Sequence, residues 1–519
     1  MALTGWLDGW MTQKARGWRF ASTLILCLLS FIVYWLGLAP TITWEHDGAD
    51  SGDLATAVAV GGVPHPSGYP TYLALGSLFH RLPLGGDVAY RLNMMSAACA
   101  ALAIGLLALA IRQGLEDWKA GRLEDWKDSL IEVSVATAAL TFAFSSTFWS
   151  QAVIAEVYTL SSLFVALLLW LALRVRAGAE SDLKWLCLAT GLALGGHLMV
   201  LLVLPLIVAL VWPVYWRQSL ARRARLLALT AAGLSVYVLI PWRAAAHPPL
   251  NWGGADDWSG FGWLVTGEAY RGYVFGLPWT YAGGRALASV QIAVRTLAWW
   301  GLPVTLWGWR TMLRHDRLLA MGSLLTVILI AGYAAGYNTT DSYLYLLPAL
   351  MLISLWMAWG LLDLLRRIVS YLPARGMVWG LLLLPAAVAA LNFPAMSLRE
   401  DRMALSFAEG TLNQVAPGAI ILVDDDRHTF ALWYARYALG QRPDVTIVNA
   451  NLLSYSWYQA SLSEAQPGLT VARNIDDLIQ QNIDQHPVYA VGNTLALPGR
   501  YDLATVEESQ PLRRLSTKP

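Results

Sequence analysis

The chain has 519 residues, of which 56% are hydrophobic and only 14% are charged. Soluble domains carry about 25% charged residues, so this composition excludes an ordinary soluble protein and indicates an integral membrane protein. The formal net charge of +1 gives no electrostatic basis for binding nucleic acid.

A transmembrane helix needs about 20 apolar residues. The first apolar run is longer than the core of a signal peptide and ends in LAPTITW, so we expect an uncleaved first span. Only the sequence GGH separates the fifth candidate span from the sixth, so these two can also be one broken pair. The chain contains about eleven candidates, at residues 19–39, 88–111, 130–148, 155–175, 184–197, 198–216, 226–243, 289–309, 318–336, 343–365 and 376–394.

Basic residues are divided unevenly between the two sets of connecting loops. The larger set includes Lys119, Arg122, Arg174, Arg176, Arg217, Arg310, Arg314, Arg366 and Arg367. The smaller set is Arg81, Arg91, Arg243, Arg271, Arg285 and Arg295. Because basic loops stay in the cytoplasm, we predict a cytoplasmic N-terminus and, with an odd number of spans, an extracytoplasmic chain after residue 394. The membrane would be the plasma membrane in a bacterium and the endoplasmic reticulum in a eukaryote.

Two long loops lie on the predicted outer side, at about 40–90 and 244–288. Both are rich in Trp, Tyr, Gly and Pro, which is not the composition of a disordered segment. Long loops without clear secondary structure are usually functional or disordered, so these two are candidates for function. Within the first loop, PTYLALGSLFHRLP predicts an amphipathic helix on the bilayer surface.

The first outer loop concentrates four carboxylates directly after the first span, at Glu45, Asp47, Asp50 and Asp53. One interpretation is structural, with Asp50 capping the following helix and Asp53 accepting hydrogen bonds from backbone amides. The other is catalytic, with a carboxylate acting as a general base beside a helix N-terminus that can seat a phosphate. The two interpretations are compatible, because one acid can cap while another reacts.

Further candidates lie near the outer ends of the spans. His65, in PHPSGYP, either contacts a phosphate oxygen or satisfies loop carbonyls. Arg243 and Arg91 either hold a lipid-linked phosphate through bidentate hydrogen bonds or extend to lipid headgroups. Polar groups at span ends either face the bundle interior or are solvated at the interface. The other pocket candidates are Tyr69, Glu156, His197, Asp341 and Tyr343.

The pattern changes after residue 394, where short apolar runs alternate with helical segments. GAIILVDDD, DVTIVNA and PVYAV indicate strands, and HTFALWYARYALG indicates a helix that ends at a glycine. We therefore predict a membrane domain at 1–394 and a small parallel α/β domain at 395–519. The acids at 424–426 follow a strand, where α/β folds often bind ligands, although a solvated loop is commoner.

Several of these stretches together resemble one family. DGADSGDLATA and VPHPSGYPTY resemble its GDSGEL and HPPGYPLY motifs, and FWSQAVIAEVYTL, NWGGADDWSGFGWLVTGEAYR and DSYLYLLPAL resemble later ones. The family is the membrane group typified by transmembrane protein 260, an O-mannosyltransferase. The resemblance implies a GT-C glycosyltransferase fold, a polyprenyl-phosphate sugar donor and an acid in the first outer loop. Asp50 matches the first acid of GDSGEL, and Asp53 stands at its Glu position, one methylene shorter.

From this resemblance we expect an inverting transfer of a sugar, with mannose as one candidate, to a hydroxyl of a protein or glycan. Asp50, or failing it Asp53, would take the acceptor proton, and the donor phosphate would lie near Arg243 or Arg91. No cofactor is required, although the four acids of the first loop can hold a divalent metal. Two alternatives stay open, a flippase for lipid-linked sugars and a non-catalytic subunit of a membrane complex.

Overall fold

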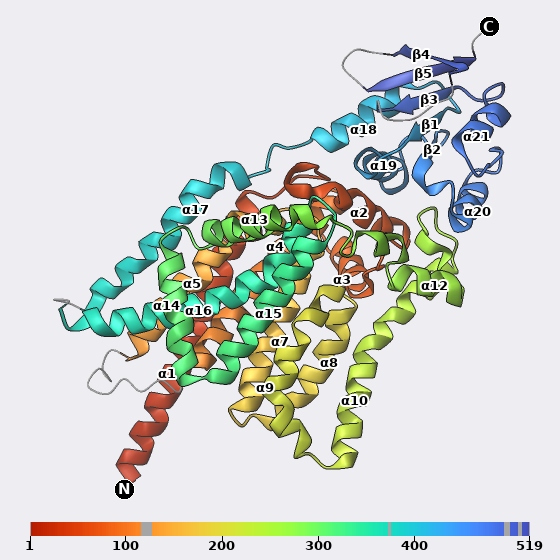
Figure 1. The fold of residues 1–519 in the computed structure, drawn as a ribbon. Helices are drawn as coiled ribbons and strands as arrows, with labels where there is room; N and C mark the ends of the chain where they lie inside the picture. Colours follow the sequence, from red (N-terminus) through yellow and green to blue (C-terminus); the bar gives the residue numbers. More distant parts are fainter. Residues whose placement is uncertain (1, 116–126, 372–374, 493–498, 507–510, 518–519) are drawn as a thin grey trace.

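The computed structural model describes residues 2–115, 127–371, 375–492, 499–506 and 511–517. A bundle of helices carries a small domain with a β-sheet at one end, and the N-terminus lies at the opposite end (Figure 1). Two of the basic residues used to predict the orientation, Lys119 and Arg122, lie outside the described residues.

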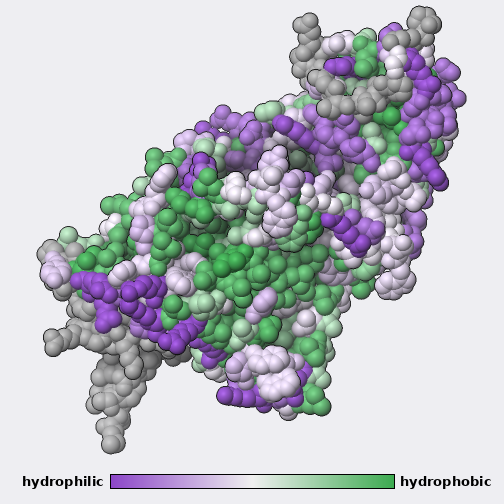
Figure 2. Space-filling model, in the orientation of Figure 1, coloured by the Kyte–Doolittle hydropathy of each residue, from purple (hydrophilic) through white to green (hydrophobic). Residues whose placement is uncertain are grey.

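Seven described helical segments are long and apolar enough to cross a membrane. They are the apolar part of α1 (Ala2–Leu36), α4 (Val88–Leu115), α7 (Tyr158–Arg176), α10 (Leu220–Leu234) continuing through η5 (Ser235–Val238) and α11 (Leu239–Ala244), α15 (Arg317–Gly336), η9 (Ser342–Leu346) with α16 (Leu347–Ile368), and η11 (Arg375–Leu382) with α17 (Leu383–Met396). The pair α5 (Lys127–Ala143) and α6 (Ser146–Ala152), bent by 68°, is an eighth candidate. The surface of this bundle is a broad apolar band between polar ends (Figure 2). The chain is therefore an integral, multi-pass membrane protein.

The other helices of the bundle are too short for the same test. They are α8 (Leu183–Leu194), α9 (Leu204–Trp216), α13 (Ala282–Thr296) and α14 (Gly301–His315). The helices α8 and α9 correspond to the fifth and sixth candidate spans, and η4 (Leu198–Leu202) lies between them. The helices α13 and α14 cover the eighth candidate span, which is interrupted by a turn between them. The count of eleven spans stays a prediction, since helix length and apolarity alone support seven spans, or eight with the bent pair, among the described residues.

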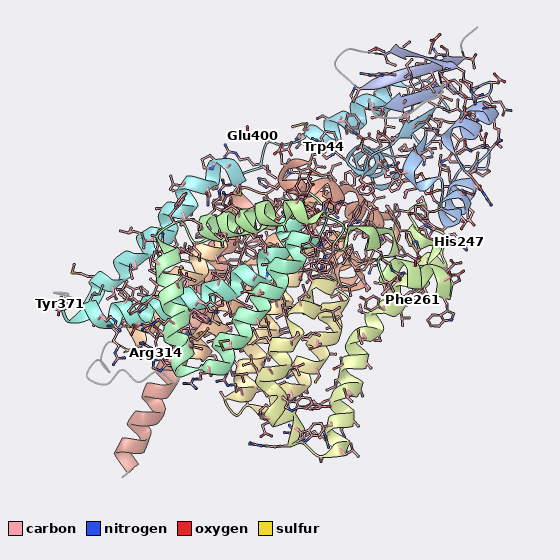
Figure 3. All side chains as sticks on the ribbon, viewed as in Figure 1. Trp44, His247, Phe261, Arg314, Tyr371 and Glu400 are labelled. Carbon is pink, nitrogen blue, oxygen red and sulfur yellow. The ribbon has the colours of Figure 1, made fainter. Side chains whose placement is uncertain are left out.

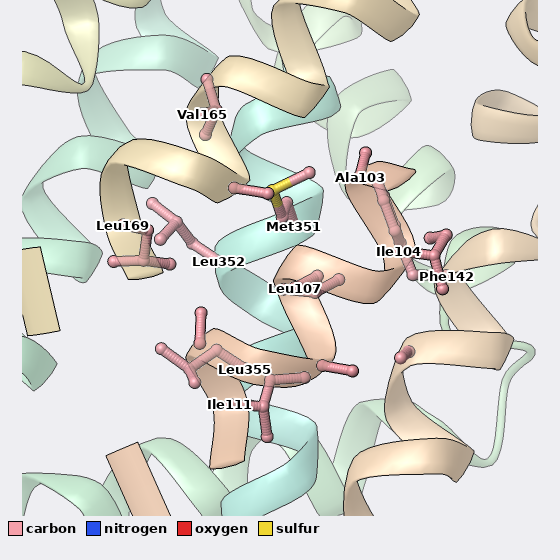
Figure 4. Close-up of a cluster of buried hydrophobic side chains, with 14 of the residues drawn as sticks. Ala103, Ile104, Leu107, Ile111, Phe142, Val165, Leu169, Met351, Leu352 and Leu355 are labelled. Atoms are coloured by element: carbon pink, nitrogen blue, oxygen red, sulfur yellow. The ribbon is translucent and has the colours of Figure 1, made fainter. Parts of the chain in front are cut away.

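The core of the bundle is packed from aliphatic side chains of α4, α5, α7 and α16 (Figure 4). The helix α16 is apolar on nearly every side and buried along its length, as expected for a central helix. One buried ion pair interrupts this core: Arg112 of α4 makes two hydrogen bonds of 2.7 Å to the carboxylate of Glu132 of α5. The hydroxyls of Ser22 and Thr23 accept the remaining donors of Arg112, so the pair ties three helices together.

Two long loops fold over the end of the bundle that carries the small domain. The first contains η1 (Glu45–Asp50), α2 (Ser51–Val60) and α3 (Pro70–Arg81), so the helix predicted for the PTYLALGSLFHRLP segment forms. The second contains η6 (Trp252–Gly254), α12 (Trp258–Val265), η7 (Glu268–Tyr273) and η8 (Trp279–Tyr281) before α13. A backbone hydrogen bond from Val63 to Leu250 joins the two loops.

The C-terminal domain contains a five-stranded sheet in the order β2-β1-β3-β5-β4. β1 (Ile420–Val423) is parallel to β2 (Thr446–Asn449) and β3 (Val488–Val491), as the alternating pattern predicts. β4 (Tyr501–Thr505) and β5 (Leu512–Thr517) form an antiparallel extension that the sequence pattern does not predict. The helical elements are α18 (Met403–Gln414), α19 (Asp426–Trp433), the π-helical turn η12 (Tyr434–Ala438), η13 (Ala450–Leu452), α20 (Ser456–Ala465) and α21 (Ile475–Asn482).

The C-terminal domain shares one continuous hydrophobic core with the two loops. A close backbone approach occurs at Gly52 of α2, where a Cβ atom would lie 2.6 Å from the carbonyl oxygen of Phe430 in α19. Trp44 donates a hydrogen bond to the backbone of Arg427, and His247 contacts Glu464 at 3.1 Å. Figure 3 labels Trp44 and His247 at these two junctions. The domain is therefore docked onto both loops, with close backbone approach at Gly52 and side-chain contacts at Trp44 and His247.

Candidate active site

A cavity of about 820 Å³ lies where the two loops, the ends of the spans and α19 meet. It combines aromatic and aliphatic walls with a few converging charges, which is typical of small-molecule sites. Six of the predicted site residues line it: Asp47, Asp50, His65, Tyr69, His197 and Asp341. Asp426 also lines it, one of the acids at 424–426 for which the sequence left a ligand site and a solvated loop open. The other lining residues that were not predicted from the sequence are chiefly Tyr270, Arg271, Tyr337, Tyr345 and Arg427.

Asp50 lies at the start of α2, but its side chain makes no capping hydrogen bond with the described residues of that helix. The capping role expected from the sequence is therefore wrong, and the carboxylate faces the cavity, where 41% of the side chain is exposed. Its nearest cationic atom is Nε2 of His65 at 3.5 Å. Burial raises the pKa of Asp50, the nearby Asp341 and Asp53 add to that effect, and the charge of His65 opposes it. Among the described residues, the Asp50 carboxylate thus makes no capping hydrogen bond and keeps acceptor capacity toward the cavity beside its contact with His65.

Asp53 is completely buried, and its two oxygens are occupied. Oδ2 accepts hydrogen bonds from the backbone N–H of His65 at 2.9 Å and from its ring Nδ1 at 2.7 Å. Oδ1 accepts a hydrogen bond from Nε1 of Trp252 at 3.0 Å. The expected acceptance of backbone amide hydrogen bonds therefore occurs, but the donor belongs to the PHPSGYP turn. Asp53 does not line the cavity.

His65 presents its second ring nitrogen to the cavity. Nε2 lies 3.2 Å from the hydroxyl of Tyr69, and the ring of Phe430 stacks on the imidazole at 6.3 Å and 14°. Burial alone would lower the pKa of His65, but the charge of Asp50 and the hydrogen bond to Asp53 raise it to about 10. Gly68, at φ +79°, makes the turn that brings Tyr69 back over His65.

His197 forms part of an aromatic wall. Its Nδ1 accepts a hydrogen bond from the backbone N–H of Met199 at 3.1 Å, which assigns the ring proton to Nε2. The ring stacks on Tyr69 at 5.9 Å and 18°, and Tyr158 and Tyr345 lie within 6.1 Å of it. This wall presents flat apolar faces with hydroxyl and N–H donors at their edges.

Two arginines supply the other positive charges of the cavity. The side chain of Arg271 is 63% exposed, donates one hydrogen bond to Thr266 and lies 3.9 Å from Glu268. Arg427 stacks on Trp44 at 4.2 Å. A signal for Arg271 was present in the sequence, because this residue belongs to the quoted GEAYR motif and is one of the few basic residues in the loops predicted to lie outside.

Asp426 adds a carboxylate from the C-terminal domain. Burial raises its pKa to about 6, with further contributions from Asp50 and Asp53 that His65 partly opposes. The helix α19 begins at this residue, capped by Asp425, whose side chain accepts a hydrogen bond from the His428 N–H. Asp426, the first residue of the helix that follows β1, therefore places a carboxylate at the cavity.

The two arginines predicted to hold a phosphate lie away from the cavity. Arg243 is buried and donates to the carbonyls of Ala57 and Gly62 and to the hydroxyl of Ser77. Arg91 donates to three carbonyls of the turn between α3 and α4, those of His80, Gly85 and Gly86. Each guanidinium thus ties loop backbone together.

The remaining predicted residues surround the site. Tyr343 donates a hydrogen bond of 2.6 Å to Asp47, which joins η9 to the first loop, and Glu45 lies on η1. Glu156 is buried between α6 and α7, where burial raises its pKa, and its Oε1 has no hydrogen-bond partner among the described residues. Within the described ranges, no group of three or more His, Cys, Asp or Glu side chains has a metal-binding arrangement.

Comparison with known proteins identifies two matching family models. Residues 50–221 match the protein O-mannosyl-transferase TMEM260 N-terminal domain, and residues 404–468 match TMEM260-associated domain 2. Protein O-mannosyl-transferase TMEM260 of Mus musculus is 27% identical over 458 residues, covering 83% of this chain. The Dictyostelium discoideum protein of the same name is 22% identical and covers 93%. The chain spans 63% and 65% of the lengths of these relatives.

The fold also matches a solved structure. The crystal structure of ArnT from Cupriavidus metallidurans bound to undecaprenyl phosphate aligns with a TM-score of 0.56 and 13% identity, covering 96% of this chain and 97% of that one. The predicted resemblance to the group typified by transmembrane protein 260 is confirmed by the family models, and the GT-C-like fold class is confirmed by the structural match.

Proposed function

We propose that this chain, similar in sequence to protein O-mannosyl-transferases and in fold to ArnT, is an inverting glycosyltransferase that uses a polyprenyl-phosphate sugar. The observation that carries the proposal is Asp50, a carboxylate that keeps acceptor capacity on the wall of the 820 Å³ cavity. Because the relatives are named protein O-mannosyl-transferases, we propose mannose as the sugar and a hydroxyl of a protein as the acceptor.

Asp50 acts as the general base. The acceptor hydroxyl attacks the anomeric carbon of the donor from the face opposite the phosphate, and Asp50 takes its proton. The new bond joins the acceptor oxygen to that carbon, the bond from the carbon to the phosphate oxygen breaks, and the phosphate leaves with the bonding electrons. One displacement inverts the anomeric configuration. Asp53 is unsuited to this role because both of its oxygens are already hydrogen-bonded.

The donor phosphate binds at Arg271, whose guanidinium is exposed at the cavity and only weakly paired. An arginine there stabilises the negative charge that develops on the leaving phosphate. Arg243 and Arg91 instead hold the loops, because both lie away from the cavity lining and their terminal guanidinium nitrogens donate to backbone carbonyls and a hydroxyl. The apolar lining residues offer a path for the prenyl tail toward the bilayer: Leu198, Met199, Leu201, Leu202 and Val274.

The acceptor enters from the side of the C-terminal domain, where Asp426 and Arg427 line the same cavity. We assign this face to the extracytoplasmic side, in agreement with the distribution of basic residues among the loops. A carboxylate and a guanidinium side by side can pair with the N–H and C=O groups of an extended peptide. The C-terminal domain thus orients the acceptor toward Asp50.

The test uses the full chain in lipid nanodiscs with polyprenyl-phosphate mannose and a serine- and threonine-containing peptide. The enzyme should release polyprenyl phosphate and mannosylate the peptide, and Asp50→Asn should lower the rate by about 10²- to 10⁴-fold. Asp256→Asn, which alters an exposed carboxylate on the second loop, is the matched control and should retain the rate. Scrambling of labelled donor in proteoliposomes without sugar transfer would replace this proposal with a flippase.

A further inference from the structure

One imidazole stands between two of the three acids of the DGADSGD motif, Asp50 and Asp53. Nδ1 of His65 lies 2.7 Å from Oδ2 of Asp53, and Nε2 lies 3.5 Å from Oδ2 of Asp50. The two carboxylates therefore contact opposite nitrogens of the same ring. Only Asp50 lines the cavity, whereas Asp53 lies entirely behind the ring.

The orientation of this ring is fixed from several directions. Asp53 holds Nδ1 and also accepts the backbone N–H of His65, so side chain and backbone are anchored to the same oxygen. Trp252 in turn fixes Asp53 through its Nε1, and Phe430 of α19 covers one face of the imidazole. Because Nδ1 is held by Asp53, Nε2 is the nitrogen left to face Asp50.

The surroundings of Asp50 are otherwise unfavourable for a carboxylate. Asp53, Asp341, Asp426 and Glu156 all interact electrostatically with it, so their negative charges oppose its ionisation. Tyr69 and His197, which also line this side of the cavity, are neutral groups, since Nδ1 of His197 accepts the Met199 N–H. The two cavity arginines have other partners: Arg271 contacts Glu268 and Thr266, and Arg427 stacks on Trp44. A fixed cation next to Asp50 is what the charge balance of the site requires.

We propose that His65 is a positioning residue, an imidazolium locked by Asp53 and Trp252 that keeps the Asp50 carboxylate ionised and aimed into the cavity. The role of this ion pair in sugar transfer rests on the proposed function, whereas the ion pair itself does not. During transfer, Asp50 takes the acceptor proton and becomes a neutral carboxylic acid, while His65 keeps both of its ring protons. Asp50 afterwards loses its proton to water in the cavity. His65 is therefore neither the base nor a transient proton carrier.

The charge of His65 can be measured without turnover. In the full chain labelled at histidine Cε1, the resonance lost in His65→Gln identifies His65, and we expect it to stay at the charged position from about pH 6 to 8. In Asp50→Asn its titration midpoint should fall by at least about 1 pH unit. An ordinary titration near pH 6.5 in the unaltered chain, or no response to Asp50→Asn, would overturn the proposal.

The pH dependence of sugar transfer tests whether His65 keeps Asp50 ionised during catalysis. Because the base must be ionised, the rate falls as pH drops through its pKa, and loss of the neighbouring cation raises that pKa. His65→Gln should therefore move the acid limb of kcat/KM upward by about 1 to 3 pH units and lower kcat more than it raises the donor KM. His197→Gln, the same substitution at the other cavity histidine, should leave the acid limb where it is.

The two experiments separate the possible failures. In one outcome the unaltered chain transfers no sugar, but His65 is charged and its titration midpoint falls in Asp50→Asn. The proposed function is then wrong, and the ion pair between His65 and Asp50 is supported. If His65→Gln lowers activity without moving the acid limb, His65 acts only on structure and the inference is wrong. A rise in the donor KM alone would instead assign His65 to the donor phosphate and would also overturn it.

Discussion

The contact between Gly52 and Phe430 gives the sharpest prediction about how the C-terminal domain completes the cavity. A Cβ atom at Gly52 would lie 2.6 Å from the Phe430 carbonyl oxygen and 2.7 Å from its carbon. Ordinary contacts need about 3.5 Å, so Gly52→Ala must separate α2 from α19 by close to 1 Å. Because the clash involves backbone atoms, no rotamer change relieves it. Overpacking of this kind costs about 1–3 kcal/mol.

Hydrogen exchange of α19 in the full chain measures that cost. If docking limits the local opening of α19, a loss of about 1–3 kcal/mol raises the exchange of its amides by about 5- to 140-fold. The matched control is Gly262→Ala in α12, where the added methyl has no atom within 4 Å. Equal exchange of α19 in the two variants would refute the reasoning, because the close approach would then carry no energy.

Three further predictions concern the donor, the bundle and the pH dependence of docking. Arg271→Gln should raise the donor KM about tenfold and also lower kcat, because this guanidinium binds the donor phosphate and stabilises the charge of the leaving phosphate. Arg295→Gln, on exposed α13, should change neither value, and equal values in the two variants would remove Arg271 from the phosphate site. Arg112→Met leaves Glu132 as an unpaired buried charge, so this variant should be less stable in thermal unfolding by about 3–5 kcal/mol. The control is Arg314→Met at an exposed position, and an equal loss of stability in the two variants would contradict the prediction. The folded pKa of Asp426, raised to about 6 by burial and by Asp50, lies above its ordinary value of 3.8, so the folded state binds this proton more tightly than the unfolded chain does. The C-terminal domain should therefore dock more firmly near pH 5, and its docking should weaken as pH rises through 6. The measurement is hydrogen exchange of the α19 amides, which should become faster with rising pH after correction for intrinsic rates. Asp426→Asn should abolish this dependence.

Much of the architecture follows from periodicity and composition. Long apolar runs mark the spans, and short apolar runs separated by turn residues mark β1, β2 and β3. The antiparallel pair β4 and β5 was not predicted, because YDLAT and LRRLST contain few apolar residues and no sustained alternation that would distinguish them from a loop. The break near η4 agrees with the alternative of one broken pair that the GGH sequence left open. The turn between α13 and α14 falls inside a predicted span, since hydropathy does not register a kink in the backbone.

The site was predictable in its location and less so in the roles of its residues. The acids of the first loop do approach the cavity, but sequence position alone could not say that Asp53 turns inward to His65 while Asp50 turns outward. The arginine prediction relied on span ends, whereas Arg243 and Arg91 satisfy loop carbonyls that only the folded turn creates. Asp426 and Arg427 enter through tertiary docking of α19, which no local pattern encodes.

The central claim is that the cavity beside Asp50 binds a lipid-linked sugar for transfer. The most direct measurement is an experimental structure of the Asp50→Asn chain in nanodiscs with polyprenyl-phosphate mannose, which the slowed variant should retain. We expect density with its phosphate at Arg271, its sugar between residue 50 and the aromatic wall of Tyr69 and His197, and its tail along η4. Donor density on another face of the bundle, with this cavity filled only by solvent, would contradict the account.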